Sequence, residues 1–121
     1  MHSILIIDDD SRNIFALTAV LKARGFQCET ATGMQEAFAL LTAGNTIGII
    51  LMDMMMPDMD GYEAIPILKS SPQWQHLPVI AVTAQAMAGD RDKCLAAGAD
   101  GYISKPVDID KLQQLLDEYA R

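Results

Sequence analysis

Short apolar runs alternate five times with longer amphipathic segments along this chain of 121 residues. The runs have the length of β-strands, and residues 4–7, 47–52 and 78–83 are apolar almost throughout, which is typical of strands buried on both faces. Residues 26–31 are less apolar and are expected nearer an edge, and residues 101–104 form a short fifth run. This alternation predicts an α/β fold, a doubly wound (βα)5 sandwich around a parallel five-stranded sheet in the order 2-1-3-4-5.

The segments between the strands carry apolar residues at the spacing of amphipathic helices. Gly25, Gly44 and Gly98 are expected to end three of these helices, and Asp108 is a good N-cap for the last one. Pro66 falls inside the third helix, where a proline is tolerated only near the first turn or at a kink. The apolar helix positions are Ile14, Leu17 and Leu21; Met34, Phe38 and Leu41; Tyr62, Ile65 and Leu68; an alanine-rich stretch from about 88 to 97; and Ile109, Leu112, Leu115, Leu116 and Tyr119.

Composition is consistent with one domain over residues 1–121. Half of the residues are hydrophobic, and a chain of this size buries roughly two-thirds of its unfolded surface. Sixteen acidic and nine basic residues give a net charge of −7, which argues against direct binding to nucleic acid or to an anionic membrane. No apolar run approaches the roughly 20 residues that span a bilayer, and no signal peptide is recognised. We expect a cytoplasmic protein in which Cys28 and Cys94 are small buried hydrophobic residues.

Polar side chains follow four of the predicted strands at the point where each strand ends. Asp8 and Asp9 follow the first strand and Asp53 follows the third, while Thr83 closes the fourth and Lys105 follows the fifth. Ligands of doubly wound sheets bind at the carboxyl ends of the strands, so one rim receives three carboxylates, a hydroxyl and an ammonium. Each residue alone is commonplace as a loop acid, a helix cap or a solvated charge. Their joint placement indicates a functional site.

The chemistry of this set is specific. Three neighbouring carboxylates repel one another, and one of them takes up a proton unless a cation joins them. A hard divalent ion, Mg²⁺ or Mn²⁺, fits such oxygen ligands. Lys105 can hold an anionic group beside the metal, and Thr83 can donate a hydrogen bond to that group. The arrangement suits phosphoryl transfer to an aspartate, with a carboxylate as nucleophile and cations offsetting the charge of the phosphoryl oxygens.

These residues resemble the receiver domain of two-component response regulators, and the resemblance covers essentially the whole chain. It implies a flavodoxin-like fold and a phosphorylation site at Asp53. It also implies that Asp9 and Asp53 bind Mg²⁺ directly, that Asp8 binds it through water, and that the backbone carbonyl of Met55 is a further ligand. The motifs that carry the resemblance are Asp8-Asp9, residues 51–61 (LMDMMMPDMDG), Val82-Thr83-Ala84 and Ser104-Lys105-Pro106.

The resemblance further implies a switch. Thr83 resembles the hydroxyl that moves onto the phosphoryl group, and Tyr102 resembles the aromatic residue that turns inward with it. Lys105 resembles the phosphate-contacting lysine, whose bond to Pro106 is cis in the family. Phosphorylation is then expected to reshape the face formed by the fourth helix, the fifth strand and the fifth helix.

The partner implied by the family is a histidine kinase or a histidine phosphotransfer domain, with small acyl phosphates as alternative donors. The domain itself is expected to promote its phosphorylation and dephosphorylation, as a monomer or weak dimer. Residues 10–17 and 86–91 look similar to receivers attached to hybrid histidine kinases. This favours a receiver from a longer hybrid kinase over a stand-alone regulator, and in either case we expect a phosphorelay role in which the output is the response of a partner.

Three alternatives share parts of this pattern. A phosphatase of the haloacid-dehalogenase type would carry its nucleophile after the first strand, where Asp8-x-Asp10 faintly fits, but it usually needs a longer chain. A flavodoxin-like binding module needs a phosphate loop rich in glycine and hydroxyl groups, where this chain has three acids. A receiver-like module that signals without phosphate usually lacks one of the acids or the lysine, and all are present here.

Two further hypotheses concern the methionines. Met55 offers no charge that could orient a water molecule, and Gln85 offers only a neutral amide. We therefore expect slower spontaneous hydrolysis of an aspartyl phosphate than acidic or amide groups at both positions would give. Of the five methionines between positions 52 and 59, Met52 and Met54 are expected in the core. The other three are expected to flank the site, and a flexible apolar surface for partner docking is the less favoured of two interpretations of their role.

Overall fold

The computed structural model describes residues 3–43, 46–83 and 89–119. Within these ranges, five strands form one parallel sheet in the predicted order β2-β1-β3-β4-β5. The strands are β1 (Ser3–Ile7), β2 (Gln27–Ala31), β3 (Ile47–Asp53), β4 (Val79–Thr83) and β5 (Gly101–Ser104). The helices are α1 (Ser11–Ala23), α2 (Met34–Thr42), α3 (Gly61–Ser70), α4 (Asp90–Ala97) and α5 (Ile109–Tyr119).

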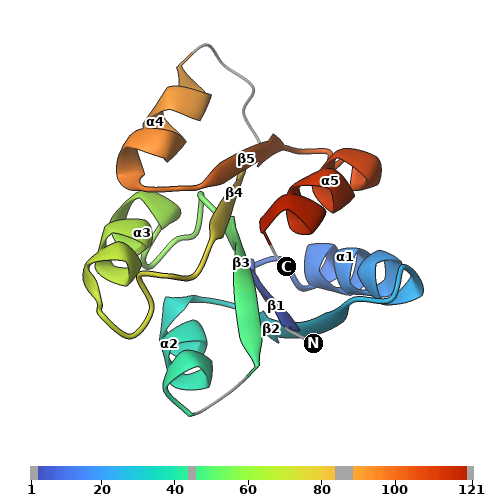
Figure 1. Cartoon of the computed structure of the whole chain (residues 1–121), viewed down its shortest axis with the longest axis horizontal. Coiled ribbons are helices and arrows are strands. Elements are labelled where there is room, and N and C mark those ends of the chain that lie inside the picture. The colour runs from blue at the N-terminus through green and yellow to red at the C-terminus, as the bar shows by residue number, and fades with distance from the viewer. Residues whose placement is uncertain (1–2, 44–45, 84–88, 120–121) are drawn as a thin grey trace.

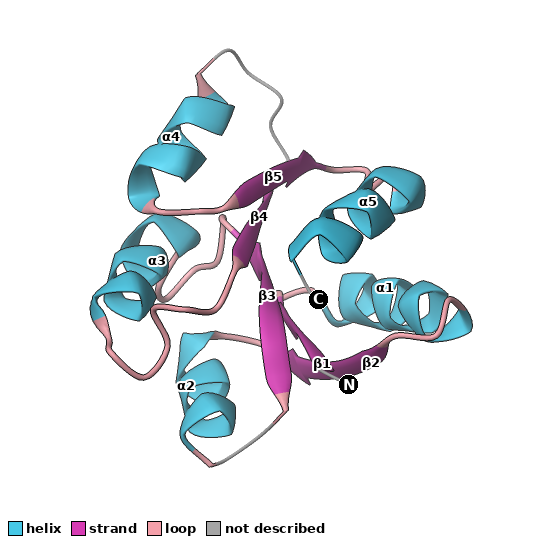
Figure 2. Cartoon of the chain, in the orientation of Figure 1, coloured by secondary structure: helices cyan, strands magenta, loops and turns pink. Residues whose placement is uncertain are grey.

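The helices cover the sheet in two layers. Helices α1 and α5 lie on one face, and α2, α3 and α4 lie on the other (Figure 1). Successive side chains of a strand point to opposite faces, so each strand contributes to both layers. In β1, Ile4 and Ile6 join the core cluster that contains α1 and α5 residues, while Leu5 and Ile7 join the cluster of α2 and α3. Figure 2 shows the resulting sandwich of helix, sheet and helix. The predicted doubly wound α/β class is confirmed.

The three central strands are buried, and this burial restricts charged functional groups to the ends of the strands. Every residue of β1 and β4 is buried, and β3 is buried except at one glycine, whereas the edge strand β2 is largely accessible. Leu5 and Ile50 are completely buried, and burial of each such side chain contributes about 1.5–3 kcal/mol. A charged side chain inside these strands would be costly, so charges appear where the strands end.

The helix boundaries follow local capping chemistry. Asp10, Asp60 and Asp108 each accept a hydrogen bond of 2.9–3.0 Å from a backbone N–H two or three residues later. The N-cap predicted at Asp108 is therefore confirmed. Gly25 and Gly98 follow α1 and α4 with φ of 92° and 114°, values that glycine tolerates without strain. The third predicted stop, Gly44, lies outside the described residues.

Several predicted details differ. Strand β2 begins at Gln27 and β3 extends one residue further than predicted, to Asp53. Helix α4 begins at Asp90, and the predicted start near residue 88 lies outside the described residues. Pro66 lies in the second turn of α3, solvent-exposed, where it cannot donate the usual helical hydrogen bond. Cys28 is half-buried rather than buried. None of the helices in the described ranges has both the length and the apolar character needed to cross a membrane.

Candidate functional site

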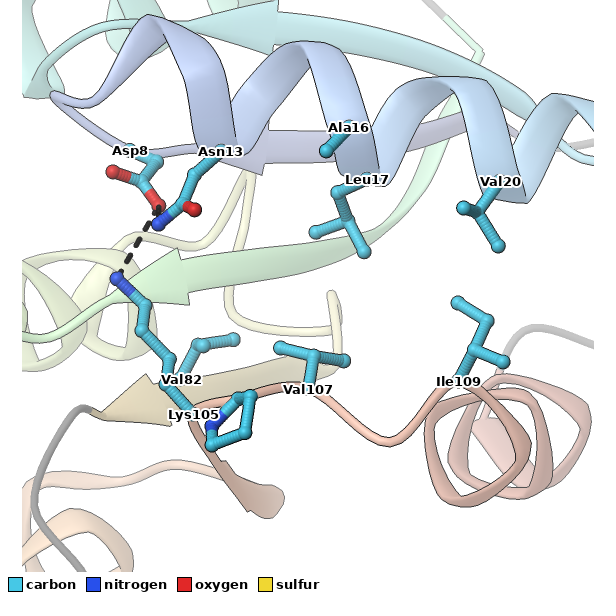
Figure 3. A pocket seen from close by; sticks show the side chains of 10 residues that line it. Asp8, Asn13, Ala16, Leu17, Val20, Val82, Lys105, Val107 and Ile109 are labelled. Carbon is cyan, nitrogen blue, oxygen red and sulfur yellow. Dashed lines mark hydrogen bonds and ion pairs between the residues drawn. The ribbon is translucent and has the colours of Figure 1, made fainter.

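Four charged side chains meet where β1, β3 and β5 end. Carboxylate oxygens of Asp8, Asp9 and Asp53 lie within 4.8 Å of one another. The Lys105 Nζ lies 3.5 Å from Asp8 Oδ2 and 3.7 Å from Asp53 Oδ2. Figure 3 shows the Lys105 side chain pointing toward Asp8. Asp8 and Asp53 are buried, whereas Asp9 is exposed. The structure thus brings together the charged residues that the sequence placed at the strand ends.

Backbone N–H groups hold the two buried carboxylates in place. The Asp10 N–H donates to Asp8 Oδ1 (2.8 Å), and the Met55 N–H donates to Asp53 Oδ1 (3.0 Å). The second oxygen of each carboxylate is the one nearer Lys105. Asn13 Nδ2 also lies 3.5 Å from Asp8 Oδ2, at the outer limit of a hydrogen bond. Sequence reasoning missed Asn13, although its place in the first turn of the helix after Asp10 could have suggested it.

Burial and a neighbouring like charge both act on the Asp53 carboxylate. Burial is the main cause that raises the pKa of Asp53 above its usual value, and the nearby Asp8 carboxylate acts in the same direction. The Met55 N–H and the Lys105 ammonium oppose this rise. When all four groups are ionised, three carboxylates face one ammonium and leave an excess of two negative charges. This set of closely spaced oxygen donors fits a hard divalent cation.

Thr83 and Tyr102 lie on β4 and β5, on one side of this cluster. Thr83 is buried at the end of β4, and its carbonyl accepts a hydrogen bond from the Lys105 N–H (2.7 Å). Tyr102 is the register partner of Ala81, so Tyr102 and Thr83 lie on the same face of the sheet, the face covered by α2, α3 and α4. Thr83 therefore adjoins the charged residues, whereas Tyr102 lies further back along the sheet. Gln85 lies outside the described residues.

The burial of the methionines between positions 52 and 59 differs in part from the prediction. Met52 and Met54 are completely buried, which confirms their place in the core. Met56 is also buried, with 6% of its surface exposed, so the predicted exposed surface is wrong for this residue. Its side chain joins the core cluster of α2 and α3. Met55 is 59% exposed and Met59 is half-buried.

An apolar groove begins at the charged cluster and runs between α1 and α5 (Figure 3). It encloses a cavity of ≈ 320 Å³. Asp8, Asn13 and Lys105 line its polar end. The groove is built by residues from distant parts of the chain, so no local sequence pattern predicted it. Its apolar lining consists of Ala16, Leu17, Val20, Val82, Pro106, Val107 and Ile109.

Comparison with known proteins identifies the family. The model of the response regulator receiver domain matches residues 4–117. The chain belongs to this family. As a receiver domain of two-component systems, it has the strand order and the acidic strand ends that its sequence predicted. The resemblance stated from the motifs is therefore confirmed.

The receiver domain is similar to parts of sensor histidine kinases. It is 40% identical over 117 residues to the sensor histidine kinase RcsC of Salmonella typhi. The aligned region covers 97% of this chain and 12% of that kinase. It thus spans about an eighth of the length of this curated relative. This likeness supports the predicted similarity to receivers of hybrid kinases.

Solved structures of receiver domains have the same fold. The receiver domain of the sensor histidine kinase PA1611 from Pseudomonas aeruginosa PAO1 is 30% identical, with a TM-score of 0.84, covering 98% of this chain and 96% of that one. That protein has a magnesium ion coordinated in its active-site cleft. The Vibrio cholerae chemotaxis protein CheY4 is 25% identical, with a TM-score of 0.88 and 98% coverage of both chains.

Proposed function

We propose that Asp53 is the phosphorylation site of this receiver domain. The observation that carries the proposal is the setting of its carboxylate. One oxygen accepts the Met55 N–H at 3.0 Å, and the other lies 3.7 Å from the Lys105 ammonium. Asp53 is 5% exposed, so this orientation is held by the fold rather than by solvent. A fixed nucleophile beside a cation is what transfer of an anionic phosphoryl group requires.

The reaction exchanges one phosphorus bond for another. A carboxylate oxygen of Asp53 attacks the phosphorus, the bond from phosphorus to a donor imidazole nitrogen breaks, and the imidazole leaves as a neutral group because its other nitrogen carries a proton. With a small acyl phosphate, the leaving group is the carboxylate of the donor. Lys105 stays beside the phosphoryl oxygens and offsets part of their charge. In a separate hydrolysis step, water attacks the phosphorus, the bond from phosphorus to the Asp53 oxygen breaks, and inorganic phosphate leaves, so the same residues would also promote dephosphorylation.

The acidic cluster would hold Mg²⁺ or Mn²⁺. Asp9 and Asp53 would bind the ion directly, Asp8 through a water molecule, and the Met55 carbonyl would provide a further oxygen. The closeness of the three carboxylates and their excess negative charge support this assignment. When bound, the ion offsets the charge of the carboxylates and of the phosphoryl oxygens. The magnesium in the similar PA1611 receiver supports the choice of metal.

Thr83 and Tyr102 would convert phosphorylation into a change of surface. Thr83 ends its strand next to Lys105, within the rim that receives the phosphoryl group. When the Thr83 hydroxyl turns toward the phosphoryl oxygens, it leaves space on the face that Tyr102 shares. Tyr102 fills this space, and the face of α4, β5 and α5 changes shape. The equilibrium between two packings shifts, and a partner reads the shift.

The histidine-bearing partner would dock on the groove between α1 and α5. This groove opens at Asp8 and Lys105, so a helix seated on it would bring its histidine to Asp53. Charge supports this choice, because α1 carries Arg12 and Lys22 and no acidic residue, in a chain with a net charge of −7. A histidine kinase or a histidine phosphotransfer domain with an acidic rim around its histidine would fit. Phe15 of α1, 78% exposed, adds an apolar contact surface.

The remaining assignments follow the family. We propose that residues 1–121 act as one receiver domain, as a monomer or weak dimer in the cytoplasm. The acidic net charge supports the absence of direct contact with nucleic acid or an anionic membrane. The likeness to RcsC supports a place in a phosphorelay of the hybrid-kinase type.

Intact mass spectrometry after incubation with acetyl phosphate tests the proposal. We expect one added phosphoryl group in the wild type with Mg²⁺, and none with EDTA or in Asp53→Asn. Asp58→Asn changes an exposed acid in the adjacent loop and is the matched control, with labelling as in the wild type. Labelling that survives Asp53→Asn and is lost in Asp8→Asn would favour a phosphatase of the haloacid-dehalogenase type. No labelling of a Mg²⁺-binding wild type by any donor would favour a receiver-like module that signals without phosphate.

A further inference from the structure

Met55 stands apart from the other methionines by its exposure. Its side chain is 59% exposed, whereas Met52 and Met54 are completely buried. Met34 and Met56 are 5% and 6% exposed, and Met59 is half-buried against the core. Among the methionines in the described ranges, Met55 is therefore the most accessible to a dissolved oxidant.

The backbone of Met55 is hydrogen-bonded to Asp53, the proposed phosphorylation site. Its N–H donates to Asp53 Oδ1 at 3.0 Å. A backbone N–Cα bond is about 1.46 Å long, so the Met55 Cα lies within about 4.5 Å of that oxygen. The carboxylate is 5% exposed while the Met55 side chain faces solvent. The Met55 backbone is thus held beside Asp53 while its thioether is open to solvent.

We infer that Met55 is a site of reversible oxidation by hydrogen peroxide, and that its oxidation shortens the lifetime of a phosphoryl group on Asp53. The inference rests on the proposed function of Asp53. In the oxidation, the peroxide O–O bond breaks, one oxygen forms a bond to the Met55 sulfur, and the other leaves as water. The thioether is oxidised to a sulfoxide, and the peroxide is reduced by two electrons. Sulfoxide reductases reverse this step with thiol reductants.

The effect follows from the change in hydrogen bonding. A thioether sulfur accepts hydrogen bonds only weakly, whereas the oxygen of a sulfoxide, which is a polar group, accepts them strongly. An acceptor next to the phosphorylated Asp53 can hold and orient a water molecule. That water attacks phosphorus, the bond from phosphorus to the Asp53 oxygen breaks, and the water proton passes to phosphate or solvent. One added hydrogen bond typically changes a rate by about two- to tenfold.

The buried methionines make the site selective. Oxidation of Met52 or Met54 would place a polar sulfoxide in the apolar core and disrupt packing. Such damage needs prior opening of the fold, so it is slower than reaction at an exposed thioether. Low peroxide concentrations should therefore modify Met55 before any of the buried methionines.

The experiment uses the whole chain treated briefly with dilute hydrogen peroxide. Peptide mass spectrometry then gives the extent of oxidation at each methionine. In parallel, the protein is phosphorylated with acetyl phosphate, the donor is removed, and intact mass follows loss of the phosphoryl group. We expect Met55 to be oxidised ahead of Met34, Met52, Met54 and Met56, and the phosphoryl lifetime to fall about two- to tenfold.

Two variants separate this effect from general damage. Met55→Leu keeps the size of the side chain but cannot be oxidised, so its phosphoryl lifetime should be the same before and after peroxide. Met55→Gln supplies an amide oxygen without peroxide and should shorten the lifetime in untreated protein. Sulfoxide reductases should restore the wild-type lifetime.

Different outcomes would overturn the effect of Met55 oxidation and the proposed phosphorylation of Asp53. Oxidation of a buried methionine before Met55, or an unchanged lifetime in protein oxidised at Met55, overturns the inference alone. An equal change in Met55→Leu also overturns it, because the effect would then arise elsewhere. Failure of the untreated wild type to accept a phosphoryl group overturns the proposed function, and the inference with it.

Discussion

The Nζ of Lys105 lies 3.7 Å from Asp53 Oδ2, across the ends of β5 and β3. Strand β4 separates these two strands in the sheet, so the lysine side chain bridges an intervening strand to reach the carboxylate. Its backbone N–H is meanwhile held by the carbonyl of Thr83. The fold thus places one cation beside a carboxylate whose pKa is raised mainly by burial.

Replacement of Lys105 should slow phosphorylation. In Lys105→Met the side chain keeps its length but loses the charge near the phosphoryl oxygens. The rate with acetyl phosphate and Mg²⁺ should fall about 10²-fold, as for loss of one donor that stabilises developing charge. The same change at exposed Lys111 on α5 is the matched control and should leave the rate near that of the wild type. Similar rates in the two variants would remove Lys105 from the reaction.

Asp53→Asn should stabilise the metal-free protein. Because burial and Asp8 raise the pKa of Asp53, the folded state binds this proton more tightly than the unfolded chain does. Wild-type stability therefore falls as pH rises from the unfolded pKa near 3.8 through the higher folded pKa. In EDTA at pH 7, the variant should gain about 0.5–2 kcal/mol in urea unfolding, and less at pH 4. A gain that is equal at both pH values would contradict the electrostatic origin.

Gly61 tests how the loop after β3 is packed. A Cβ at Gly61 would overlap Met54 Sδ and lie 3.1 Å from the Met54 Cα. Gly61→Ala should lower the free energy of unfolding by about 1–3 kcal/mol, because the buried Met54 cannot move aside freely. Gly33→Ala has no atom within 4 Å of the added Cβ and serves as control, with a loss below about 1 kcal/mol. Equal losses measured by urea unfolding would argue against the close approach.

The hydroxyl of Tyr62 should ionise at a higher pH than an ordinary tyrosine. Burial, with the Cys94 thiol 3.9 Å from its hydroxyl, raises the pKa of Tyr62 to about 12. Its ionisation, followed by near-ultraviolet absorbance, should therefore be complete only above that pH and should disappear in Tyr62→Phe. Between pH 10 and 12 the unfolded chain releases this proton while the folded state keeps it, so stability falls as pH rises. A pH dependence in Tyr62→Phe as steep as in the wild type would assign the effect to other groups.

Met55→Asn should shorten the life of the phosphorylated state. The wild-type side chain provides no strong hydrogen-bonding group beside Asp53, whereas an amide can orient water. Hydrolysis should be about two- to tenfold faster in the variant, measured after removal of acetyl phosphate. Slower hydrolysis in the variant than in the wild type would contradict the assigned influence of this position.

The charged residues of the site were predictable because the strands that precede them are continuous apolar runs. Asp8 and Asp53 each end such a run, so their placement at one edge of a parallel sheet follows from local pattern and topology. These inferences need no knowledge of packing. Tyr102, in contrast, was indicated only by the family resemblance, and its shared face with Thr83 follows from the register in the structure.

Features that depend on packing between distant segments were not predictable. The burial of Met56 depends on how the loop after β3 folds against α2 and α3. The groove between α1 and α5 depends on side chains from opposite ends of the chain. Each is set by tertiary structure rather than by residue type.

Chemical localisation of the phosphoryl group tests the central claim most directly. Protein treated with acetyl phosphate and Mg²⁺ is reduced with borohydride, which converts an aspartyl phosphate to homoserine, and is then digested for peptide mass spectrometry. The account predicts homoserine at position 53, and none when Mg²⁺ is withheld. Homoserine at Asp8 or Asp9 instead, with Asp53 unmodified, would contradict it.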